Sequence, residues 1–359
     1  MNIFDLSSYD YYLPPENIAQ FPADPRDSSR LLVWKPKENL TFSRNFRNIT
    51  DFLKTGDLLV LNDTKVIPAR LKGVRKTGGQ CEIFLLKNLT PDFLNWQVLV
   101  KPARKIHVDD KIYINGHEII ITGEFDEGIR TVKFDFSSRS DFMNFIEADG
   151  IVPLPPYIHN DNNNNMKEAY QTVFAKHEGS SAAPTASLHF TPELLEKIKA
   201  MGVKIAYVTL HVGLGTFRPV KSQDIRQHDI HSEHCEIPEV TASMINECRE
   251  KGGRIIASGT TSARTLEAFS DVDGNIFSGV KDTDLFIYPG YKFKIVDALI
   301  TNFHLPQSSL LMLVSAFAAN KADAFGHEDI ILERLIEIYK NAALNGWRFF
   351  SFGDAMFIV

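Results

Sequence analysis

Apolar residues recur along the C-terminal half of the chain in two alternating patterns, and each pattern predicts one kind of element. Short continuous apolar runs, typical of strands buried on both faces, alternate with stretches in which apolar residues recur at helical spacing. This alternation favours an α/β fold with a mostly parallel sheet flanked by helices on both faces. The predicted strands are 204–213, 254–260 and 284–290, and the predicted helices are 191–202, 240–253, 261–270 and 309–320.

The helix predicted at 191–202 has the clearest end signals. Thr191 can cap its first turn, Pro192 suits the first helical position, and Gly202 marks its end. In the N-terminal part the pattern predicts a short helical stretch at 16–20, a strand at 31–34 and a buried strand within 56–63 that ends in polar residues. The buried strand is of the same type as the strands predicted for the C-terminal half.

The pattern changes between residues 65 and 150, where short strand-like runs are separated by turn signals such as TGG, NG and DEG. This spacing predicts a small antiparallel barrel or sandwich. Because α/β-type elements flank it on both sides, we predict an inserted domain at 65–150 and a discontinuous α/β catalytic domain at 1–64 and 151–359. A length of 359 residues agrees with two domains, since single cores stop growing at about 250 to 300 residues.

The composition is that of an ordinary globular protein, with 44% hydrophobic and 23% charged residues. No apolar run approaches the roughly 18 residues of a membrane span, and the N-terminus lacks the pattern of a signal peptide. The three cysteines are widely spaced, which favours reduced thiols over disulfides. We therefore expect a cytoplasmic protein without contact to a membrane.

Basic residues gather in the predicted insertion although the whole chain has a formal net charge of -6. The segments RLKGVRK and VKPARKIH contain Arg70, Lys101 and Arg104, and a local basic face is enough to contact RNA phosphates. A charge run is more often a solvated surface, so this feature alone does not establish a nucleic-acid partner.

Polar residues follow the ends of several predicted strands, where ligands bind in open α/β sheets. Three such ends can converge on one cleft. The residues concerned are His211, Gly213, Gly215, Thr216 and Phe217 after the first strand, Gly259, Thr260 and Thr261 after the second, and Asn302, Phe303 and His304 in ALITNFHLPQSSL.

Two of these strand ends have a recognisable chemistry. GLG in HVGLGTF lacks the third glycine and the following helix of a dinucleotide motif, so a glycine turn and close backbone approach to a ligand remain open. GTTSART starts a helix whose free backbone N–H groups and threonine hydroxyls can receive an anion such as a carboxylate, although ordinary helix capping explains part of it.

The segment HDIHSEHC places three histidines beside a cysteine. Zinc is the minority interpretation because structural zinc sites usually draw ligands from two separated loops. Acid/base chemistry involving His231 and Glu233, or an ordinary surface, are the alternatives. Another segment, SSAAPTASLHF, contains Thr185 and His189 in a run of small residues that lets a ligand lie against the backbone or simply packs.

Motifs over nearly the whole chain resemble one known family, S-adenosylmethionine:tRNA ribosyltransferase-isomerase of queuosine biosynthesis. They occur in the order FPADPRDSSRLLV, GDLLVLNDTKVIPARL, PLPPYI, YQTVFA, SAAPTASLHFT, VTLHVGLGTFRPV, HDIHSEH, GTTSARTLE, FIYPGYKFKIVDALITNFHLPQSSLLMLVSAF and RFFSFGDAMFI. The chain departs from the family's usual residues at Ser181 and Ser187. Neither change interrupts a flanking motif.

The resemblance implies a discontinuous α/β domain with an inserted antiparallel six-stranded β-barrel. It also implies the reaction, in which the ribosyl part of S-adenosylmethionine moves to the aminomethyl group of 7-aminomethyl-7-deazaguanine at the wobble position of tRNA. Adenine and methionine leave, and the product is epoxyqueuosine. S-adenosylmethionine is consumed as a substrate, no further cofactor or metal is expected, and we expect a monomer.

This chemistry requires a base, an acid for the departure of adenine, and removal of a proton from the incoming amine. The catalytic candidates in the matching blocks are His211, His189, His304 and His231, with the carboxylates Asp63 and Glu233. Candidates for binding the substrate are Thr185, Gly213, Gly215, Thr216, Phe217, Gly259, Thr260, Thr261, Arg264, Asn302 and Phe303. Within this set, Phe217 or Phe303 can stack on adenine. Separate candidates for contact with tRNA phosphates are Arg70, Lys101 and Arg104 in the predicted insertion.

Two other function classes compete with this prediction. An S-adenosylmethionine methyltransferase would produce S-adenosylhomocysteine, but the chain has no recognisable glycine-rich first strand-turn with a downstream ribose acid. A non-enzymatic RNA-binding module would bind tRNA and ignore the nucleoside donor.

Overall fold

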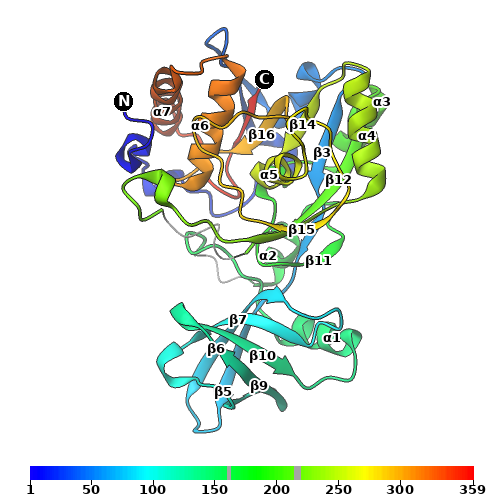
Figure 1. The fold of residues 1–359 in the computed structure, drawn as a ribbon, viewed down its shortest axis with the longest axis vertical. Coiled ribbons are helices and arrows are strands. Elements are labelled where there is room, and N and C mark those ends of the chain that lie inside the picture. Colours follow the sequence, from blue (N-terminus) through cyan, green and yellow to red (C-terminus); the bar gives the residue numbers. More distant parts are fainter. Residues whose placement is uncertain (160–162, 214–219) are drawn as a thin grey trace.

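The structure is a computed structural model that describes residues 1–159, 163–213 and 220–359. A large domain of helices and strands lies above a smaller β-barrel, and a narrow connection joins the two (Figure 1). Within the described ranges, no helix combines the length and the apolar content that crossing a bilayer requires.

The large domain is built on a nine-stranded mixed sheet with the order β15-β13-β12-β3-β14-β16-β17-β1-β2. Strands β12, β3, β14 and β16 form its parallel centre. On one side β13 is antiparallel to β12 and β15 is antiparallel to β13, and on the other side β17 is antiparallel to β16. At the other edge, β1 is parallel to β17 and antiparallel to β2. The strands are β1 (Arg30–Lys35), β2 (Leu40–Asn45), β3 (Leu58–Asn62), β12 (Lys204–His211), β13 (Glu233–Ile237), β14 (Ile255–Ser258), β15 (Gly279–Thr283), β16 (Ala298–Asn302) and β17 (Ala355–Ile358).

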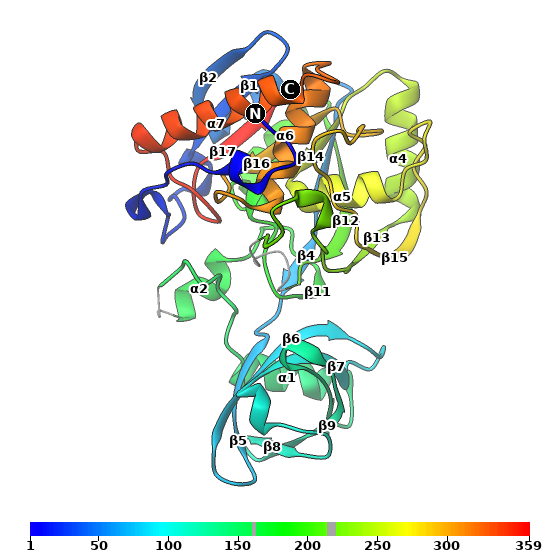
Figure 2. The same cartoon turned by 60° about the vertical axis from the view of Figure 1, so that its left-hand side comes forward.

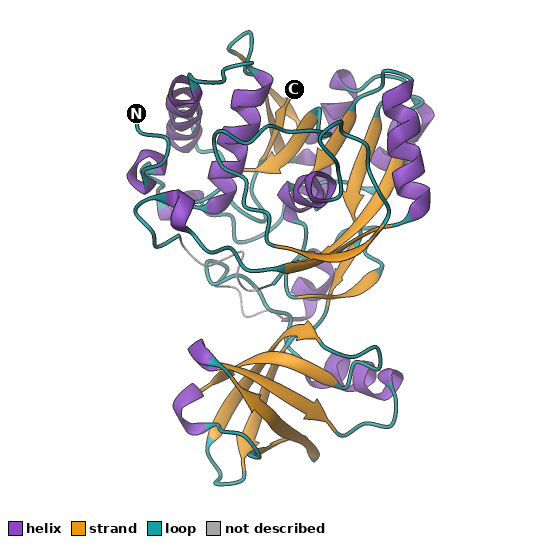
Figure 3. Cartoon of the chain, viewed as in Figure 1, coloured by secondary structure: helices purple, strands orange, loops and turns teal. Residues whose placement is uncertain are grey.

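Helices cover both faces of this sheet (Figure 3), which confirms the α/β class. Alternate residues of β3 show why: Leu58 and Val60 belong to one apolar core, and Leu59 and Leu61 belong to the other. All four side chains are fully buried, as a strand with helices on both sides requires. The α-helices are α3 (Pro192–Ala200), which packs on the second face, and α4 (Glu239–Glu250), α5 (Thr260–Ala268), α6 (Ser309–Lys321) and α7 (Glu328–Leu344), which pack on the first.

The helix predicted at 191–202 is confirmed as α3. The Thr191 side chain accepts a hydrogen bond from the backbone N–H of Leu194, and Pro192 occupies the first turn. The helical stretch predicted at 16–20 is reduced to a 3₁₀ turn at Pro15–Asn17. Other 3₁₀ turns are Leu6–Tyr9, Arg26–Ser28, Phe46–Phe52, Ala103–Lys105, Asp126–Gly128, Thr185–Ser187 and Ile225–Gln227.

The strand predicted at 284–290 is wrong, since β15 precedes it at Gly279–Thr283. Residues 284–290 form a loop, in which Ile287 is buried while Phe286 and Tyr288 pack partly against the main core. Their apolar side chains are therefore explained by packing, and Pro289 has no N–H to donate to a sheet.

The inserted domain is a closed antiparallel barrel of six strands in the order β10-β7-β6-β5-β8-β9 (Figure 2). Its interior has a separate apolar core, to which helix α1 (Arg139–Asp149) adds Phe142, Phe145 and Ile146. The barrel predicted by the resemblance is thus confirmed. Its strands are β5 (Arg70–Arg75), β6 (Gln80–Asn88), β7 (Asn95–Lys101), β8 (Lys111–Ile114), β9 (His117–Glu124) and β10 (Ile129–Phe134).

The two crossings of the chain between the domains lie side by side. Arg70 and Ile151 exchange both backbone hydrogen bonds, at 3.1 and 2.8 Å. Nearby, β4 (Thr64–Val66) pairs in parallel with β11 (His177–Ser180), and α2 (Asn163–Ala169) follows the second crossing. We retain 65–150 as the proposed limits of the insertion, since a pairing between its two ends suits an inserted domain.

Candidate functional site

A cavity of about 300 Å³ lies at the carboxyl ends of β14 and β16, and we name it the strand-end cavity. The structure brings together here six of the predicted residues, which come from three separate segments of the chain. They are Thr185, Gly259, Thr260, Thr261, Asn302 and His304. The convergence of polar strand ends expected from the sequence is therefore present for these residues.

One wall of the strand-end cavity is the start of helix α5. Gly259 precedes the helix with φ of +89°, a conformation that glycine adopts without strain. Thr261 is only 8% exposed, and its hydroxyl has no hydrogen-bond partner among the described residues. A buried hydroxyl without a partner, beside the positive end of a helix, is suited to receive an anionic group of a ligand.

A second wall of the strand-end cavity is aromatic and was missed in the sequence. The rings of Tyr157 and Phe350 are 4.3 Å apart, and the Tyr157 hydroxyl lies 2.7 Å from the Ser351 hydroxyl. Phe350 has φ of +70°, which is strained for a bulky residue. Two hydrogen bonds hold this conformation. The Asn302 amide donates to the Phe350 carbonyl, and the Phe350 N–H donates to the Phe303 carbonyl. Strained backbone of this kind clusters at functional sites, and only the fold reveals it.

Two of the predicted histidines are buried at this cavity. His304 lines it, with Nε2 2.8 Å from the Thr301 hydroxyl, and burial lowers the pKa of His304 to about 3. His189 lies behind the wall, with Nδ1 2.8 Å from the Ser29 hydroxyl and Nε2 3.4 Å from the Asn302 amide. Burial is also the main cause that lowers the pKa of His189 to about 4. Both rings are neutral at pH 7, and His189 supports Asn302 from behind.

The two residues that depart from the family pattern are buried away from the cavity lining. The Ser187 hydroxyl lies 2.7 Å from the Ser258 hydroxyl at the end of β14. The Ser181 hydroxyl donates to the carbonyl of Leu85 at 3.2 Å, which links the large domain to the barrel. Both hydroxyls therefore have partners inside the protein.

A second cavity, of about 340 Å³, lies between the barrel and the large domain, and we name it the junction cavity. Its barrel side is the connection between β6 and β7. Its other side comes from β11, from the end of β12 and from the start of β13. The lining residues are 86–91, Phe93, Glu178, Gly179, His211, Gly213, Ser232, Glu233 and His234.

His211 is one of the predicted catalytic residues that line the junction cavity. Its Nδ1 lies 2.7 Å from the Thr64 hydroxyl, and its ring is nearly parallel to that of His234, with centroids 5.9 Å apart. Burial, followed by the neighbouring His234 and His177, lowers the pKa of His211 to about 4. The ring is therefore neutral at pH 7 and able to accept a proton or a hydrogen bond.

The two predicted carboxylates are held by different partners. Glu233 forms a buried ion pair with Arg264 of α5 and accepts a hydrogen bond from the Gly213 N–H at 3.1 Å. Asp63 is buried, accepts a hydrogen bond from the Thr209 hydroxyl at 2.7 Å and lies 3.6 Å from His177. Burial raises the pKa of Asp63. Arg264 therefore holds Glu233 and is not among the described residues that line the strand-end cavity, and its contact with the substrate stays a prediction.

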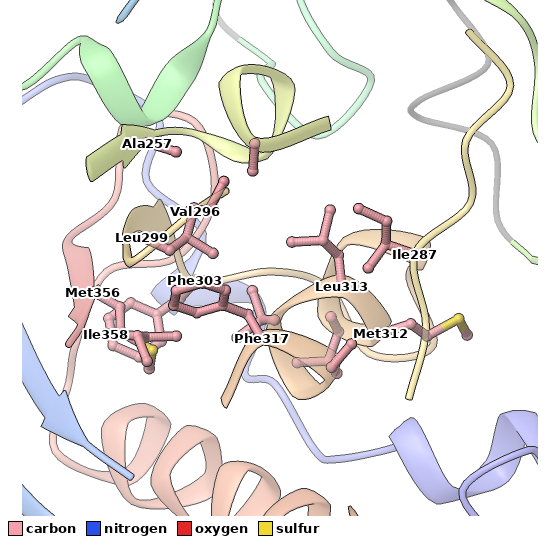
Figure 4. Close-up of a cluster of buried hydrophobic side chains, with 14 of the residues drawn as sticks. Ala257, Ile287, Val296, Leu299, Phe303, Met312, Leu313, Phe317, Met356 and Ile358 are labelled. Carbon is pink, nitrogen blue, oxygen red and sulfur yellow. The ribbon is translucent and has the colours of Figure 1, made fainter. Parts of the chain in front are cut away.

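Two further candidates are absent from the linings of both cavities as the described residues form them, and three lie outside the described residues. Phe303 is fully buried in the core beside Met356 and Ile358 (Figure 4), with its ring against Tyr339, Trp347 and Phe349, so it has no free face for adenine. His231 is exposed, and neither cavity, as formed by the described residues, includes it. The candidates outside the described residues are Gly215, Thr216 and Phe217.

The cations predicted to contact tRNA lie on the barrel. Arg70 begins β5, and its Nε is 3.8 Å from Glu82. Lys101 ends β7 opposite Glu82, and Arg104 lies in the following 3₁₀ turn; both are exposed. The β6–β7 pair lines the junction cavity at the end where β6 leads into β7. Lys101 and Arg104 lie toward the opposite end of this pair, away from the junction cavity. Their contact with tRNA stays a prediction.

The histidine-rich segment does not gather around one point. His234 pairs with Asp282 at 3.1 Å, and the thiol of Cys235 is buried and directed to the Lys281 carbonyl at 3.3 Å. Among the residues that the structure describes, no three His, Cys, Asp or Glu side chains are arranged to share a metal ion.

Comparison with known proteins identifies relatives over the full length of the chain. The family described as "Queuosine biosynthesis protein" matches residues 6–358. The S-adenosylmethionine:tRNA ribosyltransferase-isomerase of Symbiobacterium thermophilum is 49% identical over 99% of this chain and 99% of its own length. That of Syntrophomonas wolfei is 45% identical over 100% of this chain and 98% of its own.

A solved structure supports the same relationship. The crystal structure of the S-adenosylmethionine tRNA ribosyltransferase from Thermotoga maritima is 38% identical, with a TM-score of 0.55, and the match covers 98% of this chain and 100% of that one. The chain therefore belongs to the queuosine biosynthesis protein family, together with relatives named S-adenosylmethionine:tRNA ribosyltransferase-isomerase.

Proposed function

We propose that this chain is an S-adenosylmethionine:tRNA ribosyltransferase-isomerase. The proposed reaction transfers and isomerises the ribosyl moiety of S-adenosylmethionine onto the 7-aminomethyl-7-deazaguanine wobble base of tRNA. It releases adenine and methionine and yields epoxyqueuosine-tRNA. S-adenosylmethionine is consumed as a substrate, and the proposal requires no other cofactor. The names of the relatives support the donor and the RNA partner.

The observation that carries the proposal is the strand-end cavity, which we assign to the donor. Its two walls suit the two ends of S-adenosylmethionine. The N-terminus of α5 and the unpartnered Thr261 hydroxyl suit the methionine carboxylate, because backbone N–H groups and a hydroxyl there donate to an anion. The aromatic wall of Tyr157 and Phe350, with apolar Val212 and Leu310, suits the adenine ring.

The protonation of the histidines supports a role in moving protons. The reaction requires a proton to leave the carbon beside the sulfonium and another to leave the amine. His304 in the strand-end cavity and His211 in the junction cavity are neutral at pH 7 because burial lowers their pKa values. Of the six catalytic candidates, we therefore favour these two as proton acceptors. We assign His189 to positioning, because its ring nitrogens contact Ser29 and Asn302.

Adenine release tests the function directly. Purified protein is mixed with S-adenosylmethionine and tRNA bearing the aminomethyl-deazaguanine, and the expected products are adenine and methionine in equal amounts. tRNA with guanine at the wobble position is the control and should release none. Formation of S-adenosylhomocysteine would indicate methyl transfer, and tRNA binding with no reaction of the donor would indicate a binding module.

The Thr261→Val variant tests the donor site. Valine keeps the shape of the side chain and removes a hydroxyl that has no protein partner, so stability should change by less than about 1 kcal/mol. Without the hydrogen bond to the carboxylate, the KM for S-adenosylmethionine should rise about tenfold, and the KM for tRNA should stay unchanged. A Thr265→Val variant in the same helix is the control, since the Thr265 hydroxyl donates to the Thr261 carbonyl at 2.9 Å and faces the protein.

A further inference from the structure

We propose that the junction cavity binds the acceptor base, a guanine-type base with an aminomethyl arm that has swung out of its RNA loop. This inference rests on the proposed function and adds to it the place of the second substrate. Enzymes that act on a base in RNA or DNA take it out of its stack and hold it in a pocket. The junction cavity, at about 340 Å³, lies at the lower end of the usual range of ligand pockets, about 300 to 1,000 Å³, which suits one base.

The walls of the junction cavity carry the groups that recognise a guanine-type base. The Glu178 carboxylate can accept the N–H groups of its pairing edge, and the Asn88 amide can donate and accept. Lys65 and Arg139 hold Glu178 at 3.1 and 3.4 Å, so the carboxylate is positioned before any ligand arrives. Glu178 is 24% exposed, which leaves it accessible from the cavity.

An aromatic residue in a strained conformation lies on the barrel side. Phe93 has φ of +63°, and its N–H donates to the Thr90 carbonyl at 2.9 Å while its own carbonyl accepts from the Trp96 indole at 2.7 Å. The loop thus holds a bulky residue in a left-handed conformation that usually costs energy. The Arg139 guanidinium covers one face of the Phe93 ring, 4.0 Å from its centroid. Bases taken out of an RNA strand are commonly held against aromatic rings, and we assign this contact to the part of the Phe93 ring that Arg139 leaves uncovered.

The two cavities share one wall, which brings the proposed donor and acceptor together. Val212 lines the strand-end cavity, whereas its neighbours His211 and Gly213 line the junction cavity. Hydrogen bonds fix this strand end: the Ser181 N–H donates to the Val212 carbonyl at 3.0 Å, and the Val212 N–H to the Ser180 hydroxyl at 2.9 Å. An aminomethyl arm beside His211 therefore lies one residue from the donor cavity.

His211 presents one ring nitrogen to the acceptor. With Nδ1 protonated and donating to the Thr64 hydroxyl, Nε2 carries the lone pair and accepts a hydrogen bond from the amine. Gly179 lies against this nitrogen, since a Cβ there would meet Nε2 at 3.0 Å. Lys87, which lines the cavity and pairs with Asp282, and Arg139, which pairs with Glu178, are about half exposed, and their exposed sides can meet the phosphates next to the base.

The test separates the two substrates by their KM values in the adenine-release reaction. Glu178→Gln and Asn88→Ala should each raise the KM for the precursor tRNA about tenfold, as expected when one hydrogen bond to a charged or polar group is removed, and leave the KM for S-adenosylmethionine within about twofold. Glu118→Gln is the matched control, because Glu118 is also a carboxylate paired with a lysine, Lys111 at 2.9 Å, on the barrel surface. It should change neither KM.

The outcomes distinguish this inference from the proposed function. If the wild type releases no adenine, the proposed function fails. If the wild type is active and both variants, folded as judged by their thermal unfolding, keep the wild-type KM for tRNA, the junction cavity does not hold the acceptor. If both variants raise the KM for S-adenosylmethionine instead, the assignment of the two cavities is overturned.

Discussion

Arg264 of helix α5 and Glu233 of strand β13 form an ion pair almost closed to solvent, with side chains 6% and 4% exposed. Glu233 lines the junction cavity, and the first residues of α5 line the strand-end cavity. Glu233 also accepts a hydrogen bond from the Gly213 N–H of the junction cavity. The ion pair therefore connects the wall of the junction cavity to the helix that forms a wall of the strand-end cavity.

We predict that Arg264→Met lowers the free energy of unfolding by about 3 to 5 kcal/mol, because it leaves a buried carboxylate without its cation. Glu233→Gln should also destabilise the protein. In the double variant the loss should be smaller than the sum of the two, since neither charge then remains. Urea unfolding of the four proteins measures this coupling, and additive losses would contradict it.

We predict that Gly179→Ala reduces turnover and stability. Its φ is +144°, and an added Cβ would lie 3.0 Å from His211 Nε2 and 3.2 Å from two ring carbons, so the imidazole must move. Gly78→Ala is the control, because Gly78 also has a positive φ, of +83°, but open space around the added Cβ. The adenine-release rate should fall much more in Gly179→Ala, and equal rates would show that the position of His211 is unimportant.

We predict that stability falls as the pH is lowered from about 6.5 to 4. Burial lowers the pKa values of His189 and His304 to about 4 and about 3, whereas an unfolded histidine titrates near about 6.5. Between these values the unfolded chain binds protons that the folded chain does not, so each histidine should cost about 2 kcal/mol between pH 7 and 5. Well above pH 6.5 the histidines are neutral in both states, and the effect is absent.

Urea unfolding at pH 7 and pH 5 measures this dependence. His189→Gln should lose less stability between the two pH values than the wild type, although it is less stable at pH 7. His231→Gln, at an exposed position, should keep the wild-type dependence. A His189→Gln dependence equal to that of the wild type would show that the burial of His189 carries no such penalty.

We predict that Lys101→Ala combined with Arg104→Ala weakens tRNA binding and reduces its dependence on salt. For every phosphate that the variant no longer neutralises, the slope of log K against log salt should become shallower by about 1. Turnover at saturating tRNA should be retained, whereas His211→Ala should lower turnover far more than affinity. Lys199→Ala on α3 of the large domain is the control. An unchanged slope in the double variant would place the RNA elsewhere.

The sequence predicted the α/β class, the inserted barrel and the meeting of three strand ends. Two of these ends meet in the strand-end cavity, whereas the predicted residues His211 and Gly213 of the third line the junction cavity. These predictions follow from rules that act locally or through topology, since parallel strands place their carboxyl ends at the same edge of a sheet. Gly259, Thr260 and Thr261 therefore meet Asn302 and His304 in one cavity. The strand at 284–290 could not be predicted correctly, because an apolar run has the same pattern in a strand and in a loop packed on a core.

Side-chain direction and proximity between distant segments came only from the tertiary structure. Asn302 and His304 line the strand-end cavity, whereas Phe303 between them points into the core. Tyr157 meets Phe350 from the other end of the chain.

The sequence by itself determined which elements form and which residues lie at strand ends. Only the tertiary structure decided which side chains face a cavity and that the barrel closes a second cavity on the large domain. The physical reason is that neighbouring residues of an extended chain point to opposite sides. Of two adjacent residues, one side chain can therefore face a ligand cavity while the other is buried in the core. Which side is core depends on elements packed from elsewhere in the chain.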